Sequence, residues 1–200
     1  MRLRVGLPVA AEEVLAGPPV RDRWQVMGVR DEPERDLMVR RVWLRGAETG
    51  RPALVLSFAG PGQVFVTDLV LGTALDADLC FYPDHVRVLV ARRHAPAAPI
   101  TTVASALPVP AAMREYATAL AADPWLERWP MVLAGVVPVR AGDRWCLTAG
   151  TGGVPVDPGV GAPWRLVAAA GGRPVTVAGE WTAAGLRPLS AWVGERLVRL

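Results

Sequence analysis

The chain has 200 residues, of which 52% are hydrophobic, and its formal net charge is +3. This hydrophobicity, together with so small a net charge, excludes a disordered chain, and the length is sufficient to bury a core. The two cysteines, Cys80 and Cys146, allow at most one bridge, which excludes a disulfide scaffold. We therefore expect a globular protein with one compact domain or two small ones.

Every basic residue is an arginine, because the sequence contains no lysine; it also lacks asparagine and has one isoleucine, Ile100. The codons of these three residues are A/T-rich, so the composition is typical of a bacterium with a high-GC genome. The basic balance then reflects codon bias, since a nucleic-acid surface needs clustered basic residues. No segment has the pattern of a membrane span or a signal peptide, so we expect a cytoplasmic protein.

The first half is predicted to be β-rich. Residues 1–22 carry little pattern and are expected to form an N-terminal tail. Alternation of apolar and polar residues predicts strands at 23–30 and 37–45, joined as a hairpin, with the acidic segment 31–36 as a solvated turn. Further strands are predicted at 53–58, 75–82 and 86–91, which completes a β-rich subdomain over 23–94.

The middle of the chain, 95–130, is predicted to be a linker followed by a helix. Residues 110–122 have apolar side chains at helical spacing, and Pro110 suits the first helical turn. Asp123 precedes a proline and is expected to end this helix. The segment 125–129 is predicted to add a short helical turn.

A second β-rich subdomain is expected over 131–200. Its strands are predicted at 131–140, 144–148, 164–170, 174–181, 186–192 and 197–200. The chain is thus predicted to be α+β and β-rich, with antiparallel sheets or hairpins in both halves flanking a short helical segment near 110–129. The tryptophans of this half are expected to serve core and edge packing.

The residues offer little catalytic or metal-binding chemistry. The soft metal ligands are Cys80, His85, His94 and Cys146, and only the first two lie at a spacing typical of zinc, with no second pair. No serine stands in a nucleophile elbow, and no lysine exists to form a phosphate-binding loop. We therefore expect no enzyme activity, no metal and no cofactor.

Two aspartates leave an enzyme open as an alternative. Asp76 and Asp78 share one face of a predicted strand, which could bind a cation or polarise a substrate together with His85. The preferred interpretation is a polar outward face, with Ala77 and Leu79 pointing inward.

Several segments, taken in order, resemble the C-terminal region of bacterial SWIM zinc finger family proteins. They are DRWQV at 22–26, RRVWL at 40–44, RPALVLSF at 51–58, ADPWLERWP at 122–130, PWRL at 163–166 and RPVTVAGEW at 173–181. The family is named for a CxC…CxH zinc motif, which is absent from this chain, so the resemblance implies no zinc ligand here. By association it implies a protein partner from an AAA-type ATPase and von Willebrand A-domain system.

The sequence therefore predicts a non-catalytic, protein-binding interaction module. Its contacts are expected from tryptophan and arginine, the residue types that dominate interface hot spots. The candidate surface consists of Arg41, Trp43, Arg45, Trp125 and Trp129. The alternative is nucleic-acid binding, because Arg41, Trp43 and Arg45 would form one stripe along a strand.

Overall fold

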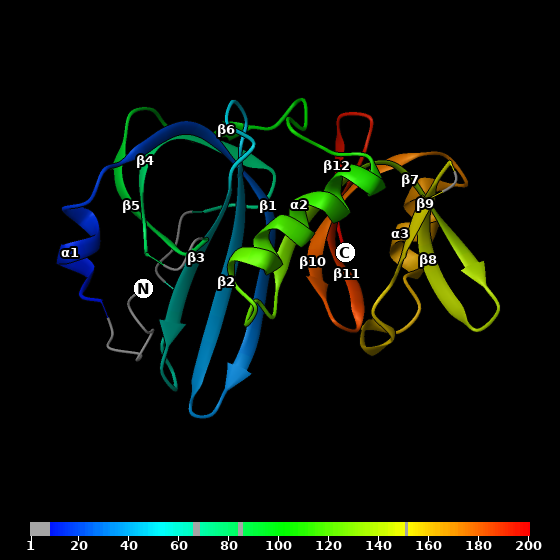
Figure 1. The fold of residues 1–200 in the computed structure, drawn as a ribbon, viewed down its shortest axis with the longest axis horizontal. Coiled ribbons are helices and arrows are strands. Elements are labelled where there is room, and N and C mark those ends of the chain that lie inside the picture. The colour runs from blue at the N-terminus through cyan, green and yellow to red at the C-terminus, as the bar shows by residue number, and fades with distance from the viewer. Residues whose placement is uncertain (1–8, 66–68, 84–85, 151) are drawn as a thin grey trace.

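The computed structural model describes residues 9–65, 69–83, 86–150 and 152–200, and it is β-rich with antiparallel sheets in both halves (Figure 1). The first half contains α1 (Ala11–Leu15), β1 (Val20–Glu34), β2 (Leu37–Gly46), β3 (Pro52–Ala59), β4 (Thr73–Phe81), β5 (Val88–Arg93) and β6 (Ala98–Pro99). After α2 (Val109–Ala122) come β7 (Trp129–Ala141), β8 (Arg144–Ala149), β9 (Gly152–Pro155), the 3-10 turn η1 (Pro158–Val160), α3 (Trp164–Ala170), β10 (Val175–Thr182), β11 (Gly185–Val193) and β12 (Arg196–Arg199).

The two sheets repeat one topology. In the first, the strand order is β3-β2-β1-β4-β5, and in the second β9-β8-β7-β10-β11, with β12 added beyond β11. Each sheet also brings its third and fifth strands together through a parallel contact. In the first sheet, the backbone N–H of Leu54 donates to the Val86 carbonyl at 2.6 Å. In the second, the N–H of Asp157 donates to the Leu186 carbonyl at 2.8 Å, so each five-stranded sheet curls until its third and fifth strands meet at a single parallel bridge. We refer to the two curled sheets as the first and the second barrel.

Most of the predicted strands are confirmed, with boundaries shifted by a few residues. The helix at 110–122 is also confirmed, and Asp123 stands at its C-cap in an extended conformation. The segment 164–170 was predicted as a strand, and this prediction is wrong because it forms α3, which ends at Gly171 in the left-handed conformation. The expected helical turn at 125–129 is likewise absent, since Trp129 begins β7. No described helix is long and apolar enough to span a membrane.

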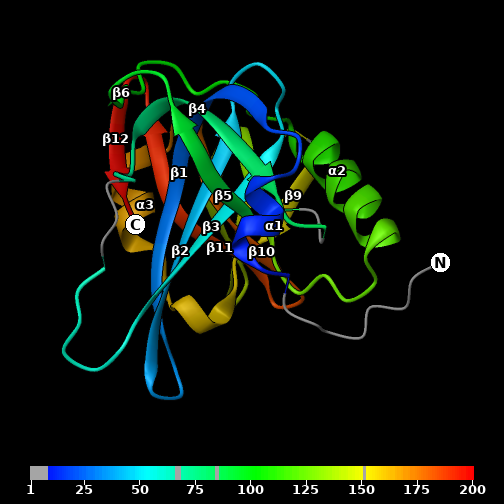
Figure 2. The same cartoon turned by 90° about the vertical axis from the view of Figure 1, so that its left-hand side faces the viewer.

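Each barrel has its own buried core. Trp24, Leu44, Leu75 and Leu79 fill the first, and all are at most 1% exposed. Leu133, Leu147, Leu166 and Leu186 belong to the second. The helix α2 covers this second core with Val109 and Ala112, and it lies between the two sheets in Figure 1. The small helix α1 packs against β4 and β5, where Val14 meets Cys80 (Figure 2).

The β1–β2 hairpin extends beyond the rest of the first sheet (Figures 1 and 2). The segment 31–36 was predicted as a solvated turn, and this is wrong because β1 continues to Glu34 and places Glu32 among arginines. Glu32 accepts a hydrogen bond from Arg128 at 2.6 Å and also forms ion pairs with Arg30 and Arg41. Burial alone would raise the pKa of Glu32, but these arginines outweigh it and lower that pKa.

A buried glutamate extends this charge cluster into the second sheet. Glu180 on β10 is fully buried and accepts hydrogen bonds from Arg30 at 3.0 Å and from the indole N–H of Trp43 at 2.7 Å. Both donors belong to the first sheet, so the carboxylate of Glu180 joins the two halves of the molecule. We call Glu32, Glu180 and the arginines Arg30, Arg41 and Arg128 the inter-sheet cluster.

A second buried carboxylate, Asp22, organises the turn between β2 and β3. Asp22 is 3% exposed and accepts hydrogen bonds from the backbone N–H groups of Arg23, Glu48 and Thr49 and from the Thr49 hydroxyl. Desolvation would raise the pKa of Asp22, but the hydrogen bonds from Thr49, Glu48 and Arg23 favour the ionised form and lower the pKa below 3.8.

We expect Asp22→Asn to destabilise the protein by about 1–3 kcal/mol at neutral pH, because an amide group cannot accept all of these hydrogen bonds. Because folding lowers the pKa of Asp22, its carboxylate stabilises the folded state at pH values above its pKa in the unfolded state. This stabilisation is lost as the pH falls through the pKa in the folded state. The difference between wild type and variant should therefore shrink below pH 3.8. Urea unfolding at neutral and acidic pH measures this difference in the free energy of unfolding. The exposed Asp143→Asn serves as the control. A difference between wild type and Asp22→Asn that is the same at both pH values would contradict the prediction.

Candidate functional site

The residues singled out from sequence lie mostly in contacts inside the molecule. Arg41, Trp43 and Arg45 occupy one face of β2, and this face is turned toward the second half. Trp43 is 2% exposed and Arg45 4% exposed, so neither is available to a partner. The Arg45 guanidinium binds Glu115 of α2 at 3.0 Å, and Arg41 belongs to the inter-sheet cluster. Of the two remaining tryptophans, Trp125 is 87% exposed, whereas Trp129 is 6% exposed.

The two aspartates of the enzyme alternative are engaged with different partners. Asp76 binds Arg21 at 3.0 Å, and this hydrogen bond lowers the pKa of Asp76. Asp78 instead faces His94, at 2.9 Å from its Nε2 atom. Ala77 and Leu79, which alternate with these aspartates along β4, are both fully buried. The third member, His85, lies outside the described residues.

The weak zinc pair of Cys80 and His85 gains no support. Cys80 is buried, and its desolvation raises the pKa of the thiol, which disfavours the thiolate that a metal needs. Within the part of the chain that the structure describes, no three His, Cys, Asp or Glu residues are grouped to hold a metal ion.

A cleft of about 790 Å³ in the second barrel was not anticipated from the sequence. Its lining residues come from the end of β7, the β7–β8 turn, β8, the end of β9, η1, the start of α3 and the β10–β11 turn. The residues that give it chemical character are Arg140, Arg144, Trp145, Asp157 and Trp164.

Two tryptophans form the aromatic part of this cleft. Trp145 on β8 and Trp164 at the first position of α3 meet edge to face, with ring centroids 5.3 Å apart and planes at 78°. Trp164 is 61% exposed, which is unusual for so large an apolar side chain. The edge-to-face contact with Trp145 fixes the orientation of the Trp164 ring while leaving much of it accessible.

Two arginines supply uncompensated positive charge beside the tryptophans. Arg140 lies one residue before the end of β7 and donates through Nε to the Gly142 carbonyl at 3.1 Å, and Arg144 begins β8 on the other side of the turn. Both side chains are exposed, and neither forms an ion pair with a described residue. Asp143 at the tip of the turn is exposed and pairs with neither of them.

The remaining carboxylate of the cleft is already neutralised. Asp157 is 5% exposed and accepts hydrogen bonds from the Gly159 N–H at 2.8 Å and from Arg187 at 2.8 Å. It therefore fixes η1 rather than presenting a free negative charge. The cleft combines an accessible aromatic ring with two exposed guanidinium groups that form no ion pair with a described residue, which suits a ligand that carries both a flat ring and an anion.

Comparison with protein-family models, with curated proteins and with solved structures found no match to this chain. The resemblance to SWIM zinc finger proteins, and the partners that it implies, therefore stay predictions.

Proposed function

We propose that the protein is a binding module for single-stranded nucleic acid and that the Trp145–Trp164 cleft is its contact surface. The observation that carries the proposal is the exposed Trp164 ring beside Arg140 and Arg144, neither of which has a carboxylate partner among the described residues. A base can stack on the accessible indole, and the two guanidinium groups can bind the neighbouring phosphates.

The position of the cleft in its barrel supports the same ligand. The strand order with a parallel contact between the third and fifth strands is that of the five-stranded Greek-key barrel called the OB-fold. Barrels of this kind bind oligonucleotides and oligosaccharides over the second and third strands and the adjoining loops. Here β8 and β9 are the second and third strands, and the turns at 141–143 and 183–184 are those loops. The positive charge of Arg140 and Arg144 favours the anionic polymer, the oligonucleotide, over the oligosaccharide.

We expect the protein to bind a fluorescein-labelled oligothymidine strand of about ten nucleotides. Fluorescence anisotropy should show an affinity that falls with salt, with a double-logarithmic slope of about −1.4 for two phosphate contacts on a single strand. Arg144→Gln should reduce the slope by about 0.7. Trp164→Ala should weaken binding by about 1–3 kcal/mol with little change in slope, because it removes stacking and not charge.

Two exposed residues outside the cleft serve as matched controls. Trp125→Ala removes another exposed tryptophan, and Arg196→Gln removes an exposed arginine on β12. Neither should change the affinity or the slope. The proposal fails if the strand does not bind at low salt, or if the control variants weaken binding as much as the cleft variants do.

A further inference from the structure

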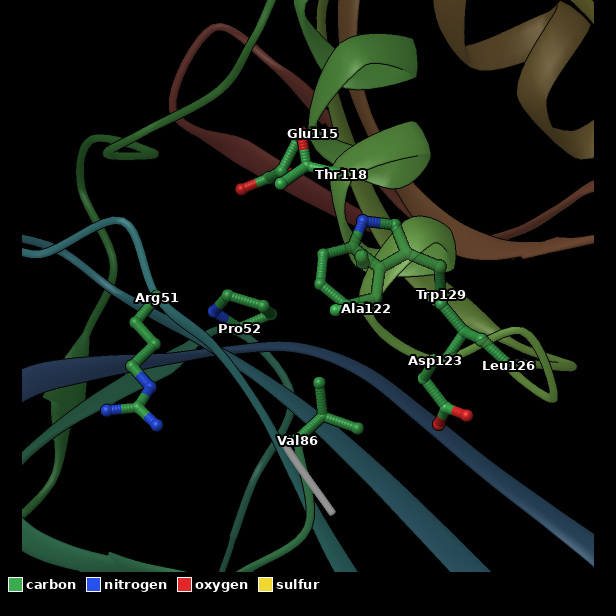
Figure 3. Close-up of a pocket in the computed structure, with 10 residues that line it drawn as sticks. Arg51, Pro52, Val86, Glu115, Thr118, Ala122, Asp123, Leu126 and Trp129 are labelled. Atoms are coloured by element: carbon green, nitrogen blue, oxygen red, sulfur yellow. The ribbon is translucent and has the colours of Figure 1, made fainter. Parts of the chain in front are cut away.

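A second hollow lies between the two barrels, beside the seam of the first one (Figure 3). Its volume is about 390 Å³. One wall is the C-terminal half of α2 with Leu126 and Trp129, and the opposite wall is Pro52 at the start of β3 with Val86. The walls are apolar, and polar groups stand mainly at the rim. We call this hollow the α2 groove.

One wall of the α2 groove contains an unsatisfied polar atom. Trp129 is 6% exposed, and its buried Nε1 atom has no hydrogen-bond partner among the described residues. Figure 3 shows the indole nitrogen on the side of the ring nearer to Glu115 and Thr118. A buried donor of this kind is costly to leave unpaired, so a ligand that shifts the Trp129 ring and brings an acceptor to this atom would gain a hydrogen bond.

The Arg51 guanidinium supplies positive charge at the rim, on the side of the groove away from Asp123 (Figure 3). Glu115 is neutralised, because both of its oxygens bind Arg45, at 2.8 Å and 3.0 Å. Arg51 has its guanidinium carbon 3.5 Å from the centre of the Phe81 ring and forms no ion pair with a described residue. Partial burial lowers the pKa of Arg51, since desolvation disfavours its charge. Asp123, at the far end of the groove, is engaged in contacts of its own, including one with the Trp125 N–H.

From these contacts we infer that the α2 groove binds a short segment of a partner protein that carries a large apolar side chain next to a carboxylate. The apolar side chain fills the space between Pro52 and Trp129, a backbone carbonyl accepts from Trp129 Nε1, and the carboxylate pairs with Arg51. A peptide fits better than a small molecule, because Trp125, next to Leu126 in sequence, extends the exposed apolar surface with a side chain that is 87% exposed. Exposed tryptophans of this kind are frequent anchors of protein interfaces.

The test uses a display library of random peptides selected on the full chain, with counter-selection on Ala122→Arg. Ala122 lines the groove on the last turn of α2, so arginine there fills the groove without disfavouring the helix. Ala121→Arg is the matched control, because Ala121 is also exposed on α2 but does not line the groove. Selected peptides should share an aromatic or large aliphatic residue beside Asp or Glu.

The affinity of a synthetic peptide of the selected sequence is then measured by isothermal titration calorimetry for the wild-type chain and for each variant. Ala122→Arg should weaken its binding by about tenfold or more, and Ala121→Arg should leave it unchanged. Arg51→Gln should weaken binding of the acidic peptide and not of its Gln-substituted analogue, which isolates the ion pair. Oligothymidine binding at the Trp145–Trp164 cleft should be unaffected by Ala122→Arg, so the two sites can fail separately.

Three results would overturn the inference. The first is that no peptide is enriched by the wild-type chain relative to the Ala122→Arg variant. The second is that the selected peptides bind the Ala121→Arg and Ala122→Arg variants with equal affinity. The third is that the chain forms a dimer in sedimentation experiments that Ala122→Arg dissociates, because the occupant would then be a second copy of the chain.

Discussion

Glu180→Ala is expected to lower the free energy of unfolding by about 3–5 kcal/mol, which is typical when one partner of a buried ion pair is removed. Glu180 is fully buried and holds both Arg30 and the indole N–H of Trp43. Alanine would leave the Arg30 charge without this partner and the Trp43 donor buried and unpaired. Both costs fall on the contact between the two sheets.

Urea unfolding followed by far-UV circular dichroism measures this loss. Glu180→Gln keeps an acceptor for Trp43 and should cost less than Glu180→Ala, because only the charge is removed. The exposed Glu195→Ala on the β11–β12 turn should change stability by no more than about 0.5 kcal/mol. A Glu180→Ala variant as stable as the Glu195 control would show that the inter-sheet cluster does not hold the halves together.

Trp24→Ala should destabilise the first barrel by about 3–5 kcal/mol, the usual cost of truncating a buried tryptophan. Trp24 is fully buried, and its indole N–H donates to the Ala77 carbonyl at 3.0 Å. Its ring lies 6.0 Å from that of Phe81, centroid to centroid. Alanine would therefore leave a large cavity and an unsatisfied carbonyl in the centre of the core.

Differential scanning calorimetry should show a lower Tm for Trp24→Ala, and Trp24→Phe should fall between it and wild type. Trp125→Ala serves as the control, since a side chain that is 87% exposed loses little packing on truncation. Below its unfolding transition, the Trp24 variant should still bind oligothymidine, because the cleft belongs to the second barrel. Equal stability of the Trp24 and Trp125 variants would contradict the assigned core.

The strands and the main helix could be predicted from the sequence because their signals are local. The hairpin of β1 and β2 follows from alternation around a turn, and α2 follows from helical spacing bounded by Pro110 and Asp123. By contrast, α3 is short and apolar, and a run such as WRLVAAA fits a buried strand as well as a helix. The choice between them is made by packing, since Leu166 and Ala170 insert into the second core.

The candidate sites could not be predicted because they depend on contacts distant in sequence. The alternation that places Trp43 and Arg45 on one face gives no sign that this face meets Glu180 and α2. In the same way, Trp145 and Trp164 come together only because α3 returns over β8. The two arginines that flank the turn at 141–143 are visible in the sequence and could have indicated a binding surface. Turns with charged residues are common on any protein surface, however, so this pattern alone does not identify a site.

The contiguity of the two barrels has a consequence for folding kinetics. Each sheet is built from one uninterrupted stretch of the chain, whereas the Arg30–Glu180 contact joins residues 150 positions apart. Loop-closure entropy penalises such distant contacts, so the barrels form early and the inter-sheet cluster forms late. Contacts that are absent from the transition state act on the unfolding rate. Loss of Glu180 should therefore shorten the lifetime of the native state while leaving the refolding rate nearly unchanged.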